Sequence, residues 1–89
     1  MLSQSELKTA QRKRLIGKIF NSGLKGKNER VLIYEEERYF ELGEEFTRAT
    51  LAELVKEGQI VRVNVGPKRF KTQAAKEKGQ IMRYFWNAR

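Results

Sequence analysis

The spacing of apolar residues changes from helical to alternating at Gly58, and this change constrains the fold more than any other feature of the sequence. Residues 48–57 have apolar side chains at helical spacing, which predicts a helix with Thr47 as its N-cap and Gly58 at its C-terminal end. Residues 59–65 alternate between apolar and polar side chains, which predicts a strand. The apolar positions are Leu51, Leu54 and Val55 in the helix and Val61, Val63 and Val65 in the strand. A helix that leads directly into a half-buried strand indicates a small α+β domain.

A second helix is expected at the N-terminus, over residues 3–22. Ser3 and Glu6 have the spacing of a capping box, in which the two residues satisfy each other's backbone N–H groups. The second half of this helix carries an apolar stripe, whereas the first half is polar and basic. The stripe consists of Leu15, Ile16, Ile19 and Phe20. We therefore expect the later turns to pack in the core and residues 1–14 to form a basic helical arm.

The segment between the two helices predicts a β-hairpin. Val31–Tyr34 and Tyr39–Leu42 have the side chains of strands, and a glutamate-rich turn joins them. Six glutamates fall in or near this hairpin: Glu35, Glu36, Glu37, Glu41, Glu44 and Glu45. A metal site is one interpretation, but metal ligands must converge, and neighbouring glutamates on a turn point apart. A solvated acidic edge, which discourages edge-to-edge pairing of strands, is the favoured interpretation.

A basic β-hairpin is expected to follow residues 59–65. Gly66–Arg69 has the composition of a turn, with Pro67 at its second position, and Phe70–Thr72 alternates as a returning strand. One face of this hairpin is apolar. The other face carries Arg62, Asn64, Arg69 and Lys71, with Lys68 at the tip.

The C-terminal segment has two interpretations. In the first, residues 73–78 form a short helix and residues 80–87 form a strand. In the second, a single helix continues through Gly79. The strand is favoured because glycine costs about 1 kcal/mol in a helix interior.

The length and the missing residue types limit the function. With 89 residues, the chain is expected to form one domain, residues 1–89, with a small core. It contains no cysteine and no histidine, which excludes disulfides, thiolate and imidazole chemistry and the common zinc sites. No nucleophile–base pair, phosphate-binding loop or metal-ligand spacing is visible, so we expect neither enzyme activity nor a cofactor. No apolar stretch of signal-peptide or membrane-spanning type is present, which predicts a cytoplasmic protein without a membrane partner.

The net charge of +8 is unevenly distributed. Residues 1–30 hold eight Lys/Arg and two Glu, for a net charge of +6. Residues 31–60 hold three Lys/Arg and eight Glu, for −5, and residues 61–89 hold eight Lys/Arg and one Glu, for +7. If the two basic ends meet on one face, that face binds a polyanion; otherwise, they neutralise the acidic middle. The first arrangement is favoured.

Residues 47–72 resemble part of a winged-helix DNA-binding domain. In Thr50–Val63 an apolar helix ends at a glycine and a strand follows, as after the recognition helix of that family. The resemblance assigns the tip of the wing to Gly66–Arg69 and the return strand to Phe70–Thr72. It also assigns the first helix to residues 3–22 and the first strand to Val31–Tyr34.

Two features of the sequence depart from the winged-helix pattern. The family places another helix just before the recognition helix, where this sequence predicts a strand and a turn. The expected recognition helix is also weakly basic as a whole. Its cations Arg48 and Lys56 are offset by Glu53 and Glu57. We therefore expect binding through the wing and the N-terminal helix rather than by major-groove reading with this helix.

The sequence thus predicts a winged-helix-like α+β domain that binds nucleic acid, DNA rather than RNA, as a transcriptional regulator or accessory protein. Lysine and arginine would contact phosphates, and Asn64 would contact a base or a sugar. The expected binding residues are Arg12, Lys13, Arg14, Arg62, Asn64, Lys68, Arg69 and Lys71. The resemblance also allows a homodimer through a terminal element. The alternative is a protein-interaction module, or a small subunit of a larger complex, that docks on a protein partner through complementary charge.

Overall fold

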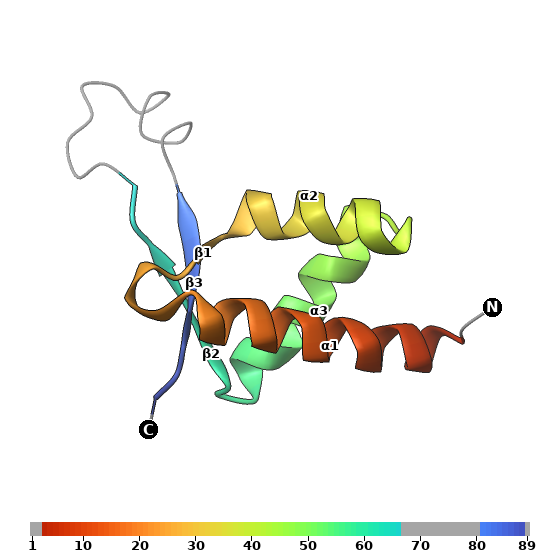
Figure 1. Cartoon of the computed structure of the whole chain (residues 1–89), viewed down its shortest axis with the longest axis horizontal. Coiled ribbons are helices and arrows are strands. Elements are labelled where there is room, and N and C mark those ends of the chain that lie inside the picture. The colour runs from red at the N-terminus through yellow and green to blue at the C-terminus, as the bar shows by residue number, and fades with distance from the viewer. Residues whose placement is uncertain (1–2, 67–80, 89) are drawn as a thin grey trace.

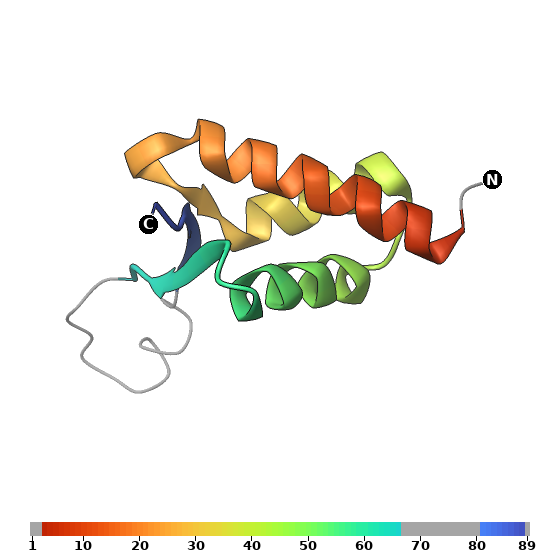
Figure 2. The ribbon, with the colours of Figure 1, turned by 90° about the horizontal axis from the view of Figure 1, so that it is seen from below.

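Residues 3–66 and 81–88 are described by the computed structural model, and they form three helices and one antiparallel sheet (Figure 1). The helices are α1 (Gln4–Asn21), α2 (Glu29–Phe40) and α3 (Glu44–Lys56), and a 3-10 turn, η1 (Gly23–Lys25), follows α1. The strands are β1 (Lys27–Asn28), β2 (Ile60–Asn64) and β3 (Met82–Trp86), in the spatial order β1-β3-β2. Figure 2 shows the helices side by side with the sheet at one end of them. The α+β class predicted from the sequence is confirmed.

The core lies where the three helices meet the sheet. Its buried apolar residues come from all three helices and from β2 and β3: Leu15, Ile19, Leu32, Ile33, Leu51, Leu54, Ile60 and Tyr84. Phe20 and Trp86 extend this core at the end of α1, with their rings edge to face and their centroids 5.4 Å apart. The buried Tyr84 places the middle of β3 against the helices. None of the helices in residues 3–66 is long and apolar enough to span a bilayer.

Helix α1 begins as the sequence predicts. The Ser3 side chain accepts a hydrogen bond from the Glu6 backbone N–H at 3.3 Å, and its hydroxyl donates to Glu6 Oε1 at 3.0 Å. The helix is continuous to Asn21, and Gln11 in its first half is fully buried. Packing of α1 therefore begins before the apolar stripe that the sequence shows.

The β-hairpin predicted over Val31–Leu42 is wrong, because this segment forms α2. The Asn28 side chain caps the helix by accepting from the backbone N–H groups of Arg30 and Val31, at 2.9 and 3.2 Å. The buried positions of α2 have helical spacing: Glu29, Leu32, Ile33 and Glu36. Two of these four are glutamates, so a search for apolar residues at helical spacing misses the pattern.

The predicted N-cap of the next helix is also wrong. Helix α3 begins one turn earlier, after Gly43, and its first turn carries Glu44 and Glu45, which the helix dipole favours there. Thr47 is fully buried inside the helix, where its hydroxyl accepts a hydrogen bond from Gln11 Nε2 at 2.8 Å. The predicted end is confirmed, since Gly58 follows α3 with a positive φ of 78°.

The predicted strand over residues 59–65 is confirmed as β2, and the favoured strand over residues 80–87 is confirmed as β3. The two pair directly, with Val63 opposite Arg83 and Asn64 opposite Met82. The predicted turn and return strand over residues 66–72 lie almost wholly outside the described residues, as does the predicted helix over 73–78. Val61 and Val63 of β2 and Val65 just after it are 38–42% exposed, so the apolar side of this strand is not buried as the sequence predicted.

Candidate nucleic-acid interface

A hollow of about 390 Å³ lies between α3 and the sheet. We call it the α3–β2 hollow; it is lined by Glu29, Arg48, Ala52, Val55, Lys56, Arg62 and Tyr84. Three of these residues are cations, and Glu29 is the one carboxylate among the described residues that line it. The hollow therefore has an excess of positive charge.

The exposed ridge of α3 borders this hollow. Its members recur every three or four residues, opposite the buried side of the helix: Glu45, Arg48, Ala49, Ala52 and Lys56. The two alanines leave the middle of the ridge free of long side chains. A flat or grooved partner can approach the helix closely there, with Arg48 and Lys56 on either side.

The acidic residues near the end of α3 are hydrogen-bonded to side chains of α1. Glu53 accepts from Lys8 Nζ at 3.3 Å, and Glu57 accepts from Arg12 NH1 at 2.8 Å. The hydrogen bond from Arg12 holds the pKa of Glu57 below its usual value. These carboxylates are engaged with α1, whereas Arg48 on the exposed ridge is paired with Glu44 at 3.1 Å and with Glu29 at 3.3 Å. Lys56 is a cation of the ridge that has no ion pair within the described residues.

Glu29 organises the floor of the α3–β2 hollow. Arg62 Nε donates to its Oε2 at 2.9 Å, the Tyr84 hydroxyl donates to the same oxygen at 2.6 Å, and Arg48 NH1 lies 3.3 Å from Oε1. Burial alone would raise the pKa of Glu29, but the hydrogen bonds from Arg62 and Tyr84 and the charges of both arginines hold it below its usual value. A single ionised carboxylate thus positions two arginines at the edge of the hollow.

The structure does not bring the predicted residues of α1 to this hollow. Arg12 turns to Glu57 of α3. Arg14 turns the other way, to the fully buried Glu36 of α2, with an NH2–Oε2 distance of 2.9 Å, and its guanidinium stacks 3.6 Å above the Tyr39 ring. Lys13 is exposed on α1. The charges of both arginines are compensated within the fold.

The predicted residues of the basic hairpin are described in part. Arg62 lies on β2 and lines the α3–β2 hollow, and Asn64 ends β2 with its side chain accepting from the Gly66 N–H at 3.0 Å. Lys68, Arg69 and Lys71 lie outside the described residues. By sequence, residues 67–80, which join β2 to β3, hold five Lys/Arg and one Glu, for a net charge of +4.

The glutamates considered as metal ligands do not converge. Glu36 is buried against Arg14 and Lys18, and Glu44 accepts from Arg48 Nε at 3.1 Å. Across residues 3–66 and 81–88, no group of three acidic side chains is arranged to hold a metal ion.

Sequence reasoning missed Arg48 and Lys56 as candidate binding residues. It summed the charge over α3 and did not ask which positions of the helix are exposed, as Arg48 and Lys56 are. The helical period could have found them. Comparison with known proteins adds no relative: no family model, curated protein or solved structure matches this chain.

Proposed function

We propose that this chain is a winged-helix protein that binds double-stranded DNA through α3, β2 and the segment that joins β2 to β3. The order of elements supports the fold assignment: a helix, a short strand, two helices and two strands, with β3 in the middle of the sheet. Helix α2 stands just before α3, where the winged-helix family has a helix and the sequence predicted a hairpin.

The observation that carries the proposal is the cationic edge of the α3–β2 hollow beside the two small side chains, Ala49 and Ala52, in the middle of the exposed ridge of α3. A recognition helix must fit the major groove, and Ala49 and Ala52 give α3 a narrow exposed side. Arg48 and Lys56 of α3 and Arg62 of β2 line the α3–β2 hollow beside that side of the helix. Lysine and arginine in such positions contact phosphates on the two edges of a groove.

The segment 67–80 supplies the second part of the proposed interface. It joins two paired strands, the position of the wing in this family, and its net charge of +4 is half that of the whole chain. Its cations Lys68, Arg69 and Lys71 would add phosphate contacts to those of α3. The proposal includes a regulatory or accessory role in transcription and a cytoplasmic location.

Fluorescence anisotropy tests the proposal directly. The protein is titrated into labelled duplex DNA, single-stranded DNA and RNA at several salt concentrations. We expect duplex DNA to bind most tightly, with an affinity that falls linearly with salt on a log–log plot, by a slope of about −0.9 per phosphate contacted. An absence of binding to all three at the lowest salt would overturn the proposal.

A pair of variants with equal charge localises the interface. Arg48→Gln with Lys56→Gln removes two cations from the α3 ridge, and Arg30→Gln with Arg38→Gln removes two exposed cations from α2. We expect the first variant to lose about tenfold or more in affinity for duplex DNA, since charge-assisted contacts are lost. The control variant should stay within about threefold, because only long-range attraction is reduced. Equal losses in both variants would remove α3 from the interface.

A second candidate function is docking on a basic protein partner, and the distribution of charge supports it. Glu6, Glu37, Glu41 and Glu45 lie at the start of α1, the end of α2 and the start of α3, which meet at the end of the molecule opposite the sheet (Figure 1). None of the four is in an ion pair within the described residues. Glu37→Gln with Glu41→Gln would abolish such docking and leave DNA binding intact.

A further inference from the structure

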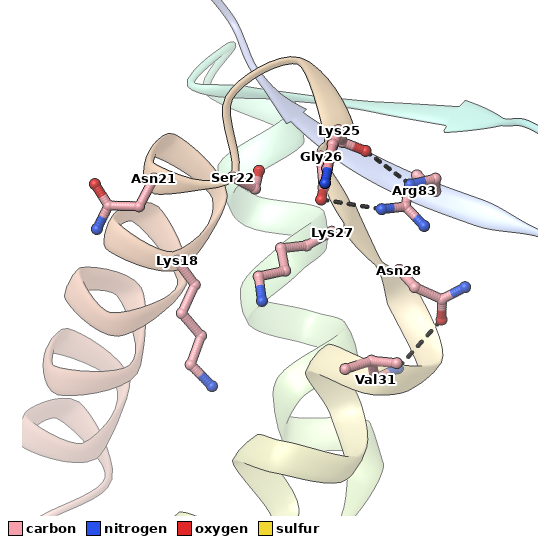
Figure 3. Close-up of a pocket in the computed structure, with 9 residues that line it drawn as sticks. All are labelled: Lys18, Asn21, Ser22, Lys25, Gly26, Lys27, Asn28, Val31 and Arg83. Carbon is pink, nitrogen blue, oxygen red and sulfur yellow. Dashed lines mark hydrogen bonds between the residues drawn. The ribbon is translucent and has the colours of Figure 1, made fainter.

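A second hollow, of about 670 Å³, opens between the end of α1, β1 and the start of α2 (Figure 3). We call it the β1 hollow. Its cations are Lys18, Lys25, Lys27 and Arg83, and among the described residues that line it there is no carboxylate. No residue lines both this hollow and the α3–β2 hollow.

The two hollows lie toward opposite edges of the sheet. The β1 hollow is lined by Lys27 and Asn28 of the edge strand β1, whereas the α3–β2 hollow is lined by Arg62 of the other edge strand, β2. The strand β3 lies between them and contributes Arg83 to the first hollow and Tyr84 to the second. A ligand in the β1 hollow would therefore not compete for space with DNA bound on α3.

The charge of Arg83 is held in place without being neutralised. Its Nε donates to the Lys25 carbonyl at 2.9 Å and its NH2 to the Gly26 carbonyl at 3.1 Å. Figure 3 shows the guanidinium against the backbone of these two residues. The arginines that bind carboxylates behave differently: Arg12, Arg14, Arg48 and Arg62. A carbonyl carries no net charge, so the positive charge of Arg83 remains available to an anion. The guanidinium has five N–H donors, and the two carbonyls do not use all of them.

Gly26 brings Lys25 and Lys27 to the same hollow as Arg83. A Cβ atom at Gly26 would lie 2.7 Å from the Tyr84 carbonyl oxygen, so the chain passes too close to β3 for a side chain. Lys25 and Lys27 flank this crossing, and neither is in an ion pair within the described residues. Lys18, by contrast, is paired with Glu35 at 3.1 Å.

The donors of this hollow are side chains rather than the end of α2. The first free N–H groups of that helix, at Arg30 and Val31, already donate to the Asn28 side chain. The positive charge therefore comes from three cations on η1, β1 and β3, which the antiparallel pairing of β1 with β3 holds at one edge of the sheet.

We propose that Lys25, Lys27 and Arg83 form an anion-binding site for a phosphate-bearing ligand. Planar guanidinium and flexible ammonium groups together suit the several oxygens of a phosphate group. The phosphate comes either from a small polyphosphorylated molecule or from the backbone of a nucleic acid segment other than the one on α3. Binding of a small polyphosphorylated molecule does not depend on the proposed function, whereas the nucleic acid alternative rests on it.

Titration with inorganic tripolyphosphate, followed by the amide resonances in NMR, tests the site. We expect the largest shifts at residues 25–28 and at Arg83. Lys25→Gln with Lys27→Gln should weaken binding by about tenfold or more, whereas the control Lys8→Gln with Arg38→Gln, of equal charge, should bind nearly as the parent does. Shifts centred on α3 and β2, or equal binding by both variants with parent-like spectra, would overturn the proposal.

Titration with short duplex DNA identifies the source of the phosphate. If the Lys25 and Lys27 variant loses tripolyphosphate binding and binds duplex DNA as the parent does, the ligand is a small molecule. If it also loses the capacity for a second duplex, the ligand is a nucleic acid backbone. A failure of the Arg48 and Lys56 variant to weaken DNA binding would count against the α3 interface and leave the tripolyphosphate result unaffected.

Discussion

Arg62 Nε on β2 lies 2.9 Å from Glu29 Oε2 at the start of α2, across 33 positions of sequence. The Tyr84 hydroxyl reaches the same oxygen from β3, so one carboxylate joins a helix to two strands. Glu29 is only 8% exposed, and its charge is stabilised mainly by these partners and by Arg48. The stability of the domain and the position of the arginines at the α3–β2 hollow therefore depend on the same side chain.

Replacing Glu29 by glutamine should destabilise the fold by about 1–3 kcal/mol. The amide keeps the shape but loses the charge that Arg48 and Arg62 bind. The loss is moderate because both arginine side chains are 43–49% exposed and can turn to water. Urea unfolding at neutral pH measures the difference, with Glu37→Gln, at an exposed position of α2, as the control. An unchanged midpoint for Glu29→Gln would show that the network contributes little.

The same carboxylate predicts how stability changes in acid. The pKa of Glu29 lies below its usual value of 4.5 in the folded state, so the folded protein releases this proton more readily than the unfolded chain. Its contribution is complete above about pH 4.5 and is lost as the pH falls through the folded pKa. The stability difference between the parent and Glu29→Gln should therefore shrink on acidification below that pH. A difference that stays constant under acid would contradict the linkage.

The sequence predicted the elements whose signals are local. The capping box of Ser3 and Glu6 fixed the start of α1, and Gly58 marked the change from α3 to β2. The C-terminal strand followed from the cost of Gly79 in a helix. Each of these signals depends on backbone chemistry within a few residues, which a single sequence contains.

Helix α2 could not be predicted in the same way, because its buried side includes Glu29 and Glu36. A glutamate is compatible with burial only when partners arrive from elsewhere in the chain. Those partners, Arg62 for Glu29 and Arg14 for Glu36, are 33 and 22 positions away. Val31–Tyr34 alone has the composition of a strand, whereas the N-cap at Asn28 is a local signal of the helix that the prediction did not use.

The candidate site was also predicted only in part. Arg62 was expected on the basic face of β2 and lies at the α3–β2 hollow. Arg12 and Arg14 were expected beside it, but each is paired with a carboxylate of another helix. A cluster of like charges in sequence does not show which of them the fold will neutralise.

Tyr84 should ionise late in alkaline titration. Burial, followed by its hydrogen bond to Glu29, raises its pKa from 10.0 to about 12. The folded state then holds a proton that the unfolded chain has lost, so this contribution to stability is complete below pH 10 and is lost as the pH rises to about 12. Tyrosinate absorbance should show a late component that Tyr84→Phe removes. The same difference spectrum centred near pH 10 would indicate that the phenol is not buried.

Gln11 and Thr47 should show strongly non-additive stability. Their side chains share a buried hydrogen bond of 2.8 Å, and Gln11 Oε1 is buried without a partner in the described residues. Gln11→Leu or Thr47→Val alone leaves a buried polar atom unsatisfied and should cost about 1–3 kcal/mol. The double variant removes both groups and should be near the parent in stability. A double-mutant cycle by urea unfolding measures the coupling, and additive losses would contradict it.

Two glycines should respond to alanine in opposite directions. At Gly17, inside α1, an added Cβ meets nothing within 4 Å, so alanine should stabilise the helix by about 0.5–1 kcal/mol. At Gly26 the backbone has φ 68° and ψ −169°, a region open mainly to glycine, and the Cβ would lie 2.7 Å from the Tyr84 carbonyl oxygen. Alanine there should cost about 2–4 kcal/mol, because β1 must move away from β3.

Thermal unfolding of Gly17→Ala and Gly26→Ala, compared under the same conditions, shows whether Gly26 is needed for the packing of the chain against β3. If Gly26 served only as a flexible link after η1, the stabilities of the two variants would differ little. A large loss confined to Gly26→Ala would instead show that the crossing over β3 is required for the sheet. Because the same crossing holds the carbonyls that fix Arg83, Gly26→Ala should also weaken tripolyphosphate binding under conditions where the variant remains folded.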